Sequence, residues 1–253
     1  MMSRRMMSRR MQALLIALCC AALLTGCALT PPASVDYAAL IASPDREDAD
    51  RQIDPRRKQP HLIAITGVRP GMQVLDMGAG GGYTTELLAR AVGAGGKVFA
   101  QDSKETIARV QARFDGRMKK PVMAPVSRVV RTFDDPVPPG TGNLDLITFF
   151  FAYHDTAFMP VDRARMNRTL FAALKPGGVL VVADHAAAAG AGIGVVKSLH
   201  RIEESVVRRE IEAAGFRLVE EAQFLRNPGD LRDEIVFRAK QPVDEFVLKF
   251  VKP

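Results

Sequence analysis

The sequence predicts an α/β domain built on a doubly wound, mostly parallel seven-stranded sheet whose last strand runs antiparallel. Short apolar segments alternate along the chain with longer segments of helical periodicity, which is the pattern of a parallel sheet covered on both faces. The apolar segment at residues 144–151 is expected at the centre of that sheet. In the final segment, residues 245–251, apolar side chains alternate, as suits the antiparallel strand. The 253 residues suffice for one such domain.

The first 26 residues are predicted to be an export signal. Four arginines precede the apolar run 13–24, which is shorter than the roughly 20 residues that a membrane-spanning helix needs. The sequence Leu24-Thr25-Gly26-Cys27 is similar to the bacterial lipobox. That similarity implies cleavage before Cys27, a lipid on Cys27, and a protein anchored in the bacterial cell envelope that faces the periplasm. The alternatives are a plain signal peptide and an uncleaved anchor.

Charge and cysteine content limit the possible partners. The net charge is +7, but four of the positive charges are the arginines before Cys27, where there is no acid, so the remaining chain carries +3. No stripe of basic and aromatic residues is visible, and we expect no nucleic-acid partner. Cys19, Cys20 and Cys27 are the only cysteines, so the folded domain has no disulfide and no cysteine metal site.

Residues 27–60 are predicted to be a tether with an N-terminal helical lid, and they contain a short helix within 36–50. The charged segment 54–60 is bounded by prolines. It is either a solvated connector or a lid that places Asp54 or Arg57 over a ligand. The main domain is expected over residues 61–253.

The domain is divided into strands and helices by its turn residues and apolar periodicity. The predicted strands are residues 73–76, 97–102, 126–131, 144–151, 179–184, 217–224 and 245–251, with 234–238 also closing the sheet. The predicted helices are residues 61–67, 84–92, 106–118, 163–174 and 195–214, the last with a break near Ser205.

A glycine-rich turn follows the first strand and carries the strongest functional signal. Asp76, Gly78, Gly80 and Gly82 form an Asp-x-Gly-x-Gly-x-Gly pattern that leads into a helix, as in α/β domains that bind nucleotide-type ligands. Tyr83 stands where the dinucleotide fingerprint has its third glycine, which counts against a nicotinamide-dependent oxidoreductase.

Asp102 ends the second strand about 20 residues after the glycine turn, where a ribose-binding carboxylate is expected. The alternative role is structural, because the sequence Asp102-Ser103-Lys104-Glu105 also fits a helix capping box.

These motifs, in this order, resemble the class I S-adenosylmethionine-dependent methyltransferases. The sequence Leu174-Lys175-Pro176-Gly177-Gly178 and the pair Gly215-Phe216 extend the resemblance over residues 60–253. The whole chain is similar to bacterial predicted methyltransferases that carry export signals.

The resemblance implies a Rossmann-like fold and S-adenosylmethionine as the cofactor. It assigns Asp76, Gly78, Gly80 and Gly82 to the methionine and loop contacts and Asp102 to the ribose. It assigns Asp134 to the adenine, although Asp135 could take that role, and an ordinary turn explains both acids equally well.

Three of the four histidines are the candidates for acid–base catalysis. His154 and His185 follow the fourth and fifth strands, at the sheet edge where ligands bind, and His200 comes later in the chain. His154 is the leading candidate for a base that removes the proton of the acceptor. Structural roles are the alternative. A His/Asp metal site was also considered, but no tight ligand spacing supports it, so we expect no metal.

The sequence therefore predicts an S-adenosylmethionine-dependent methyltransferase with a small-molecule acceptor. Its predicted location creates a conflict, because S-adenosylmethionine is a cytoplasmic metabolite. The alternative is an exported, non-catalytic binding module on the same fold.

Overall fold

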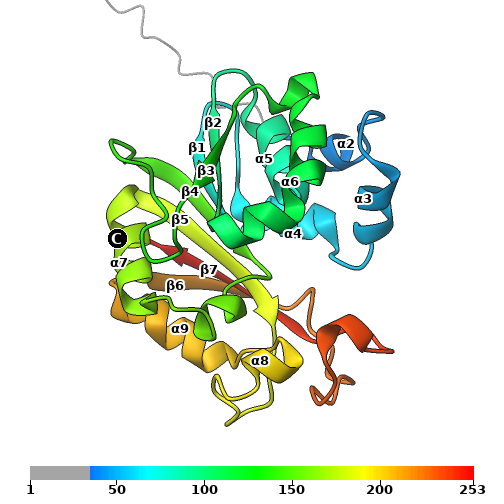
Figure 1. Ribbon diagram of the computed structural model, residues 1–253, viewed down its shortest axis with the longest axis vertical. Coiled ribbons are helices and arrows are strands. Elements are labelled where there is room, and N and C mark those ends of the chain that lie inside the picture. Colours follow the sequence, from blue (N-terminus) through cyan, green and yellow to red (C-terminus); the bar gives the residue numbers. More distant parts are fainter. Residues whose placement is uncertain (1–34) are drawn as a thin grey trace, which may run out of the picture. The chain divides into compact units, whose positions relative to one another are not determined.

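A seven-stranded sheet organises residues 35–253, which are the residues that this computed structural model describes (Figure 1). From one edge to the other, the strands are β3 (Val126–Val130), β2 (Lys97–Asp102), β1 (Gln73–Met77), β4 (Leu144–Phe150), β5 (Leu174–His185), β7 (Glu245–Val251) and β6 (Arg217–Ala222). Only β7 runs antiparallel to its neighbours. The predicted fold class is confirmed. The predicted signal and the lipid-bearing Cys27 lie outside the described residues.

The strand order reverses between β1 and β4. From β1 the chain moves outward through β2 to β3, and it then returns to the other side of β1 and continues through β4 and β5. At such a switch point the loops that leave the two strands turn to opposite faces of the sheet, which opens a crevice at the carboxyl ends of the strands. This edge is therefore the place where a ligand site is expected.

Alternating side chains of the strands divide the core into two layers. Val74 and Leu146 face the layer that contains α4 (Gln59–Thr66) and α5 (Tyr83–Val92). Their neighbours Leu75 and Ile147 face the layer of α7 (Arg163–Ala173) and α9 (Glu204–Ala213). Burial of each such side chain contributes about 1.5–3 kcal/mol. Helices cover both faces (Figure 1), which explains why the central strands lack polar alternation.

Most predicted elements lie within two residues of their observed positions, but two segments differ more. Between the pairs Leu144–Leu174 and Leu146–Val179, residues 175–178 bulge out of β5, so the predicted Pro-Gly turn is contained within a long strand. The strand predicted over residues 234–238 is wrong, because this segment ends in the 3-10 helix η3 (Val236–Arg238). None of the residues of η3 is buried, so the segment lies at the surface and adds no strand to the sheet.

The predicted break in the late helix is confirmed a few residues before Ser205. Helix α8 (Val196–Leu199) ends at His200, which has a left-handed conformation with φ 53°, and α9 begins at Glu204. Ile202, between the two helices, forms a parallel bridge with Ala186. The break therefore directs the chain at His200 back toward the end of β5.

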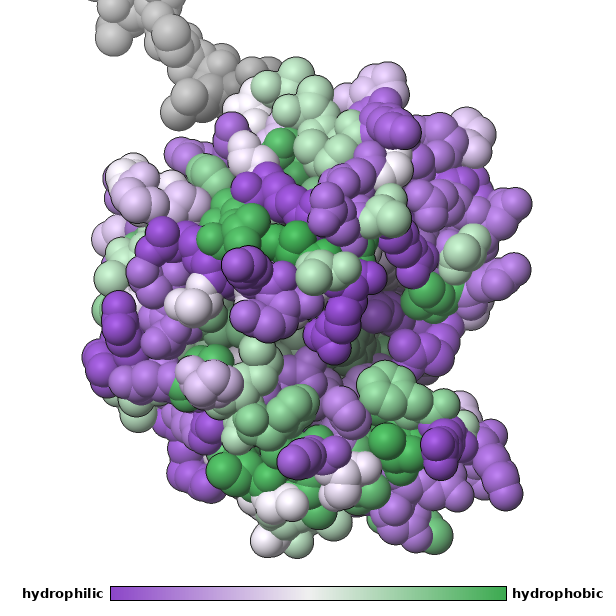
Figure 2. Space-filling view, viewed as in Figure 1, coloured by the Kyte–Doolittle hydropathy of each residue, from purple (hydrophilic) through white to green (hydrophobic). Residues whose placement is uncertain are grey.

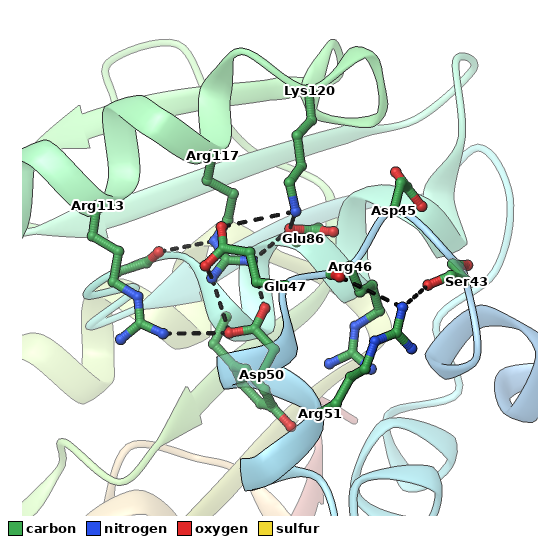
Figure 3. Close-up of polar contacts among 12 residues, drawn as sticks. Ser43, Asp45, Arg46, Glu47, Asp50, Arg51, Glu86, Arg113, Arg117 and Lys120 are labelled. Carbon is green, nitrogen blue, oxygen red and sulfur yellow. Dashed lines mark hydrogen bonds and ion pairs between the residues drawn. The ribbon is translucent and has the colours of Figure 1, made fainter.

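The N-terminal helices α2 (Tyr37–Ile41) and α3 (Asp48–Ile53) are joined to the domain by a buried ion network (Figure 3). Arg117 of α6 (Lys104–Met118) is fully buried and contacts Asp50 of α3 at 2.6 Å, and it also pairs with Glu86 of α5. Its Nε donates to the Gly81 carbonyl at 3.0 Å. Because buried charges must be paired, this network fixes α3 against the glycine turn. No helix of residues 35–253 is long and apolar enough to cross a bilayer.

Candidate active site

A cavity of about 770 Å³ lies at the carboxyl edge of the sheet. Gly78 and Asp102 line one half of it, and His154, Asp155 and His200 line the other half. The aromatic side chains Phe133, Phe151, Phe158 and Phe237 complete the wall. The surface in Figure 2 is largely hydrophilic and is hollowed to the right of its centre. The volume falls within the roughly 300–1,000 Å³ that is usual for small-molecule sites.

The glycine turn adopts backbone conformations that require glycine. Gly78, Gly80 and Gly82 have φ values of 64°, 56° and 81°, in the left-handed region. A Cβ at Gly78 would lie 2.9 Å from the Cβ of Ala152, so the turn also packs too closely against the end of β4 for any side chain. The glycine turn can therefore lie at the cavity in this conformation only because its glycines have no side chains.

Asp76 lies beneath this turn, with a side chain that is buried and fully hydrogen-bonded. Its two carboxylate oxygens accept from the hydroxyls of Thr85 at 2.6 Å and Thr148 at 2.8 Å. Burial raises the pKa of Asp76 to about 6, although the two hydroxyls act in the opposite direction. Asp76 thus links β1 to α5 and β4, and its predicted contact with the methionine part of the cofactor stays a prediction.

Asp102 has one carboxylate oxygen bound and one free. Oδ2 accepts from the Gly80 N–H at 2.8 Å, whereas Oδ1 is buried and has no partner. Burial raises the pKa of Asp102 to about 7. The predicted helix cap lies in this segment, but Ser103 and not Asp102 caps α6, so the Asp102 side chain is not used for capping. A buried carboxylate oxygen without a partner on a cavity wall is suited to accept a hydroxyl proton from a ligand.

The acids after β3 occupy different positions. Asp135 pairs with the side chain of Arg131. Asp134 is half-buried in the turn that directly follows Phe133, a residue of the cavity wall. The predicted adenine contact of Asp134 therefore stays a prediction, and Asp135 is already engaged.

The predicted histidines do meet at the opposite half of the cavity. His154 begins η2 (His154–Ala157), directly after β4, and its Nδ1 lies 2.7 Å from Oδ1 of the fully buried Asp184. Its Nε2 lies 3.3 Å from His200 Nδ1 and 3.2 Å from Asp155 Oδ1. His185 is close but separate: it stacks on Phe151, with ring centroids 5.2 Å apart.

The pKa values of His154 and His200 are shifted in opposite directions. Burial alone would lower the pKa of His154, but Asp184 and Asp155 outweigh it and raise that pKa to about 10. Burial would likewise raise the pKa of Asp184, but His154 outweighs it and the pKa is lowered. For His200, burial and the charge of His154 lower the pKa. In the metal-free chain, His200 is therefore the better proton acceptor near neutral pH.

Arg57, one of the two residues that the lid interpretation of segment 54–60 names, packs between aromatic side chains. Its guanidinium lies 4.9 Å from the ring centroid of Tyr83 and 4.6 Å from that of Phe151, and its Nε is buried without a partner. The neighbouring Asp54 is engaged, since Arg46 and the Tyr83 hydroxyl both bind it at 2.6 Å. Segment 54–60 is thus packed against the glycine-turn helix, as the lid interpretation requires. The sequence named Asp54 and Arg57 together, and the structure leaves Arg57 as the residue that is not engaged in an ion pair among the described residues.

Comparisons with known proteins bear on the family and the fold. Residues 74–178 match the family model of the methyltransferase domain. Relatives include the ubiquinone/menaquinone biosynthesis C-methyltransferase UbiE of Shewanella sp. (strain W3-18-1), which is 32% identical over 126 residues, or 49% of this chain and 47% of that protein. The UbiE of Shewanella oneidensis has the same identity and coverage. The chain spans about half the length of the curated relatives it matches.

Solved structures share the fold at low sequence identity. A SAM-dependent methyltransferase from Aquifex aeolicus aligns with a TM-score of 0.58 and 18% identity, over 87% of this chain and 100% of that chain. A putative sarcosine dimethylglycine methyltransferase from Galdieria sulphuraria aligns with a TM-score of 0.57 and 17% identity, over 81% and 91% of the two chains.

Proposed function

Residues 74–178 match a methyltransferase domain and the fold is shared with a SAM-dependent methyltransferase, and from this premise we propose that the protein is a class I S-adenosylmethionine-dependent methyltransferase that transfers a methyl group to a small-molecule acceptor. The observation that carries the proposal is the free, buried oxygen of Asp102, which lies on the cavity wall beside the glycine turn. The family and the fold imply S-adenosylmethionine as the cofactor.

The residues of the cavity fit this cofactor. Asp102 Oδ1 has no partner among residues 35–253 and can accept a hydrogen bond from a ribose hydroxyl, while Gly78 allows close approach of the backbone. Arg57 brings a positive charge with no carboxylate partner to the glycine-turn side, where it would pair with the carboxylate of the methionine moiety. Phe133 lines the wall next to Asp134 and would pack against the adenine.

Bound S-adenosylmethionine supplies a methyl group on a positively charged sulfur, which is already activated toward nucleophiles. The protein therefore has to hold the acceptor in line and exclude water. The Phe151 ring, which lines the cavity, packs against both the Arg57 guanidinium and the His185 ring, and these contacts restrict its movement. His154 is oriented by Asp184. These contacts fix the polar end of the histidine half of the cavity, which His154, Asp155 and His200 line, before any ligand binds.

The histidine half, where the acceptor would bind, combines aromatic walls with a polar end. This favours a small acceptor that has an apolar, ring-containing part and one ionisable group. Phe158 and Phe237 flank His200, with ring centroids 5.9 Å and 4.8 Å from it. The relatives are ubiquinone/menaquinone biosynthesis C-methyltransferases, which supports a ring-containing acceptor. Without a bound metal, His200 rather than His154 would accept the acceptor's proton, since its pKa is the lowered one.

Calorimetric titration with S-adenosylmethionine tests the cofactor site. We expect micromolar binding by the wild type. Asp102→Ala should bind about 10–100-fold more weakly, because hydrogen bonds to a charged group contribute about 1.5–3 kcal/mol. The matched control is Glu220→Ala, an exposed acid on β6. A folded wild type that binds no S-adenosylmethionine would instead support the exported, non-catalytic binding module.

We also propose that the protein is lipid-anchored through Cys27 in the cell envelope and faces the periplasm. The basic residues, the short apolar run and the lipobox-like Leu24-Thr25-Gly26-Cys27 support this location. Palmitate labelling should be present in the wild type and absent from Cys27→Ala. An unlabelled wild type would contradict the anchor.

A further inference from the structure

Three side chains at the polar end of the cavity present ligand atoms at nearly equal separations. His154 Nε2 lies 3.3 Å from His200 Nδ1 and 3.2 Å from Asp155 Oδ1, and the latter two atoms are 3.5 Å apart. We propose that His154, Asp155 and His200 bind one divalent transition-metal ion, with Zn²⁺ preferred.

The separations match a tetrahedral site. With metal–ligand distances of about 2.0–2.1 Å, the ligand atoms of a tetrahedral Zn²⁺ site lie about 3.3–3.4 Å apart. The three observed separations scatter around this value. Two imidazoles also disfavour Mg²⁺ and Ca²⁺, which select oxygen ligands.

Asp184 provides the support that metal-binding histidines usually have. Its Oδ1 lies 2.7 Å from His154 Nδ1, and its Oδ2 accepts from the His154 backbone N–H at 2.8 Å. A proton held on Nδ1 by this carboxylate leaves the lone pair on Nε2, the atom that faces the other two ligands. Asp184 is completely buried at the end of β5, so the orientation of the His154 ring is fixed by the sheet.

The site also has an open position. Three protein ligands leave the fourth position of a tetrahedron unfilled, which is typical of catalytic rather than structural zinc sites. Because all three side chains line the cavity, the fourth ligand would come from the cavity. The ion would bind an oxygen or sulfur of the acceptor and lower its pKa. With the ion bound, His200 is a ligand and not a base.

The sequence led to the expectation of no metal, because His200 is distant in the chain from His154 and Asp155 and no ligand spacing is visible. The left-handed residue His200, at the end of α8, returns the chain to η2 and creates the third vertex. The competing explanation is a hydrogen-bonded cluster in which a protonated His154 lies between Asp184 and Asp155. A direct binding measurement separates the two explanations.

The experiment titrates the purified, chelator-treated protein with Zn²⁺, and with Co²⁺ as a spectroscopic probe. We expect one ion per chain and the visible absorption of tetrahedral Co²⁺. Asp184→Asn should weaken Zn²⁺ binding about 10–100-fold, as loss of a supporting carboxylate does, and His200→Ala should weaken it more. The matched control is His61→Ala, because His61 stacks on Phe224 outside the cluster. Circular dichroism verifies the fold of each variant.

Two results would overturn the proposal: a folded wild type that binds no Zn²⁺, or a folded His200→Ala that binds it as tightly as the wild type. The second result would assign the ion to other ligands. The metal site does not depend on the proposed methyl transfer, and its failure can be recognised separately. Asp102→Ala should retain Zn²⁺ while losing S-adenosylmethionine, and His200→Ala should show the reverse.

Discussion

In the two halves of the cavity, the pKa values of the buried carboxylates are shifted in opposite directions. In the half beside the glycine turn, burial raises the pKa of Asp76 to about 6 and that of Asp102 to about 7. In the histidine half, the pKa of the equally buried Asp184 is lowered, because His154 lies 2.7 Å away. The first half thus offers hydrogen-bond acceptors to a ligand with neutral hydroxyls. In the second half, Asp184 already has a charged partner in His154.

The difference shows that the two halves depend on their acids in different ways. The histidine half needs Asp184 for its stability, since this carboxylate compensates a buried cation. The glycine-turn half keeps Asp102 at a cost to stability, which binding of a ligand would justify. Substitutions in the two halves should therefore have opposite effects on the free energy of unfolding.

The largest effect is expected for Asp184→Ala. Removal of Asp184 leaves His154 with only the partly exposed Asp155 as a counter-charge, and breaking a buried ion pair typically costs about 3–5 kcal/mol. Urea unfolding followed by circular dichroism measures the loss. The exposed control Glu220→Ala should change the free energy by no more than about 0.5 kcal/mol. A loss below about 1 kcal/mol for Asp184→Ala would show that the pair does not form as described.

Gly78→Ala should mainly affect the ligand and not the histidine half. The new Cβ would lie 2.9 Å from the Cβ of Ala152, on a backbone with φ 64°. Displacement of the turn should weaken S-adenosylmethionine binding by roughly 100-fold, since strain and lost contacts of about 1–3 kcal/mol combine. Gly116→Ala in α6, where a Cβ meets nothing within 4 Å, is the control. Unchanged affinity for the cofactor would place the ligand elsewhere.

Asp102→Asn should make the protein more stable at pH 8 by about 1–3 kcal/mol. The pKa of Asp102 is raised on folding, so ionisation costs stability as the pH rises from about 4 through 7. The cost is fully present above pH 7, and asparagine removes it. The gain should therefore shrink toward zero near pH 4. Thermal unfolding at both pH values measures it, and a destabilised variant at pH 8 would contradict the uncompensated carboxylate.

The smallest expected effect is the pH dependence of cofactor binding. Below pH 7 the Asp102 carboxylate becomes protonated and accepts ribose hydroxyl protons less well, so the affinity should fall by up to about tenfold per pH unit. In Asp102→Asn this dependence should be absent. Calorimetry between pH 6 and 8 compares the two proteins, and parallel pH profiles would assign the titration to another group.

The two halves also differ in how far the sequence predicted them. The glycine turn and Asp102 were predictable because backbone conformation and strand order place them locally, and β2 and α5 have the expected bounds. The histidine cluster was predicted only as residues of one sheet edge. Its geometry depends on the break at His200, which the sequence placed a few residues late, near Ser205.

The roles of two further residues also depend on tertiary contacts. Arg57 is defined as a site residue by the Tyr83 and Phe151 rings, which come from distant segments. Phe237 belongs to the segment wrongly predicted as a strand, and it contacts His200 instead. Local patterns encode such residues only as a charge or an aromatic ring.

The separation of the cavity into two halves is tested most directly by one calorimetric comparison of S-adenosylmethionine binding. We predict that the wild type and His200→Ala bind it with affinities within about threefold, since a substitution in the histidine half should not change the free energy of binding in the other half. Asp102→Ala should bind about 10–100-fold more weakly. Equal weakening in both variants would contradict the separation, and an unaffected Asp102→Ala would contradict the assignment of the cofactor to the glycine-turn half.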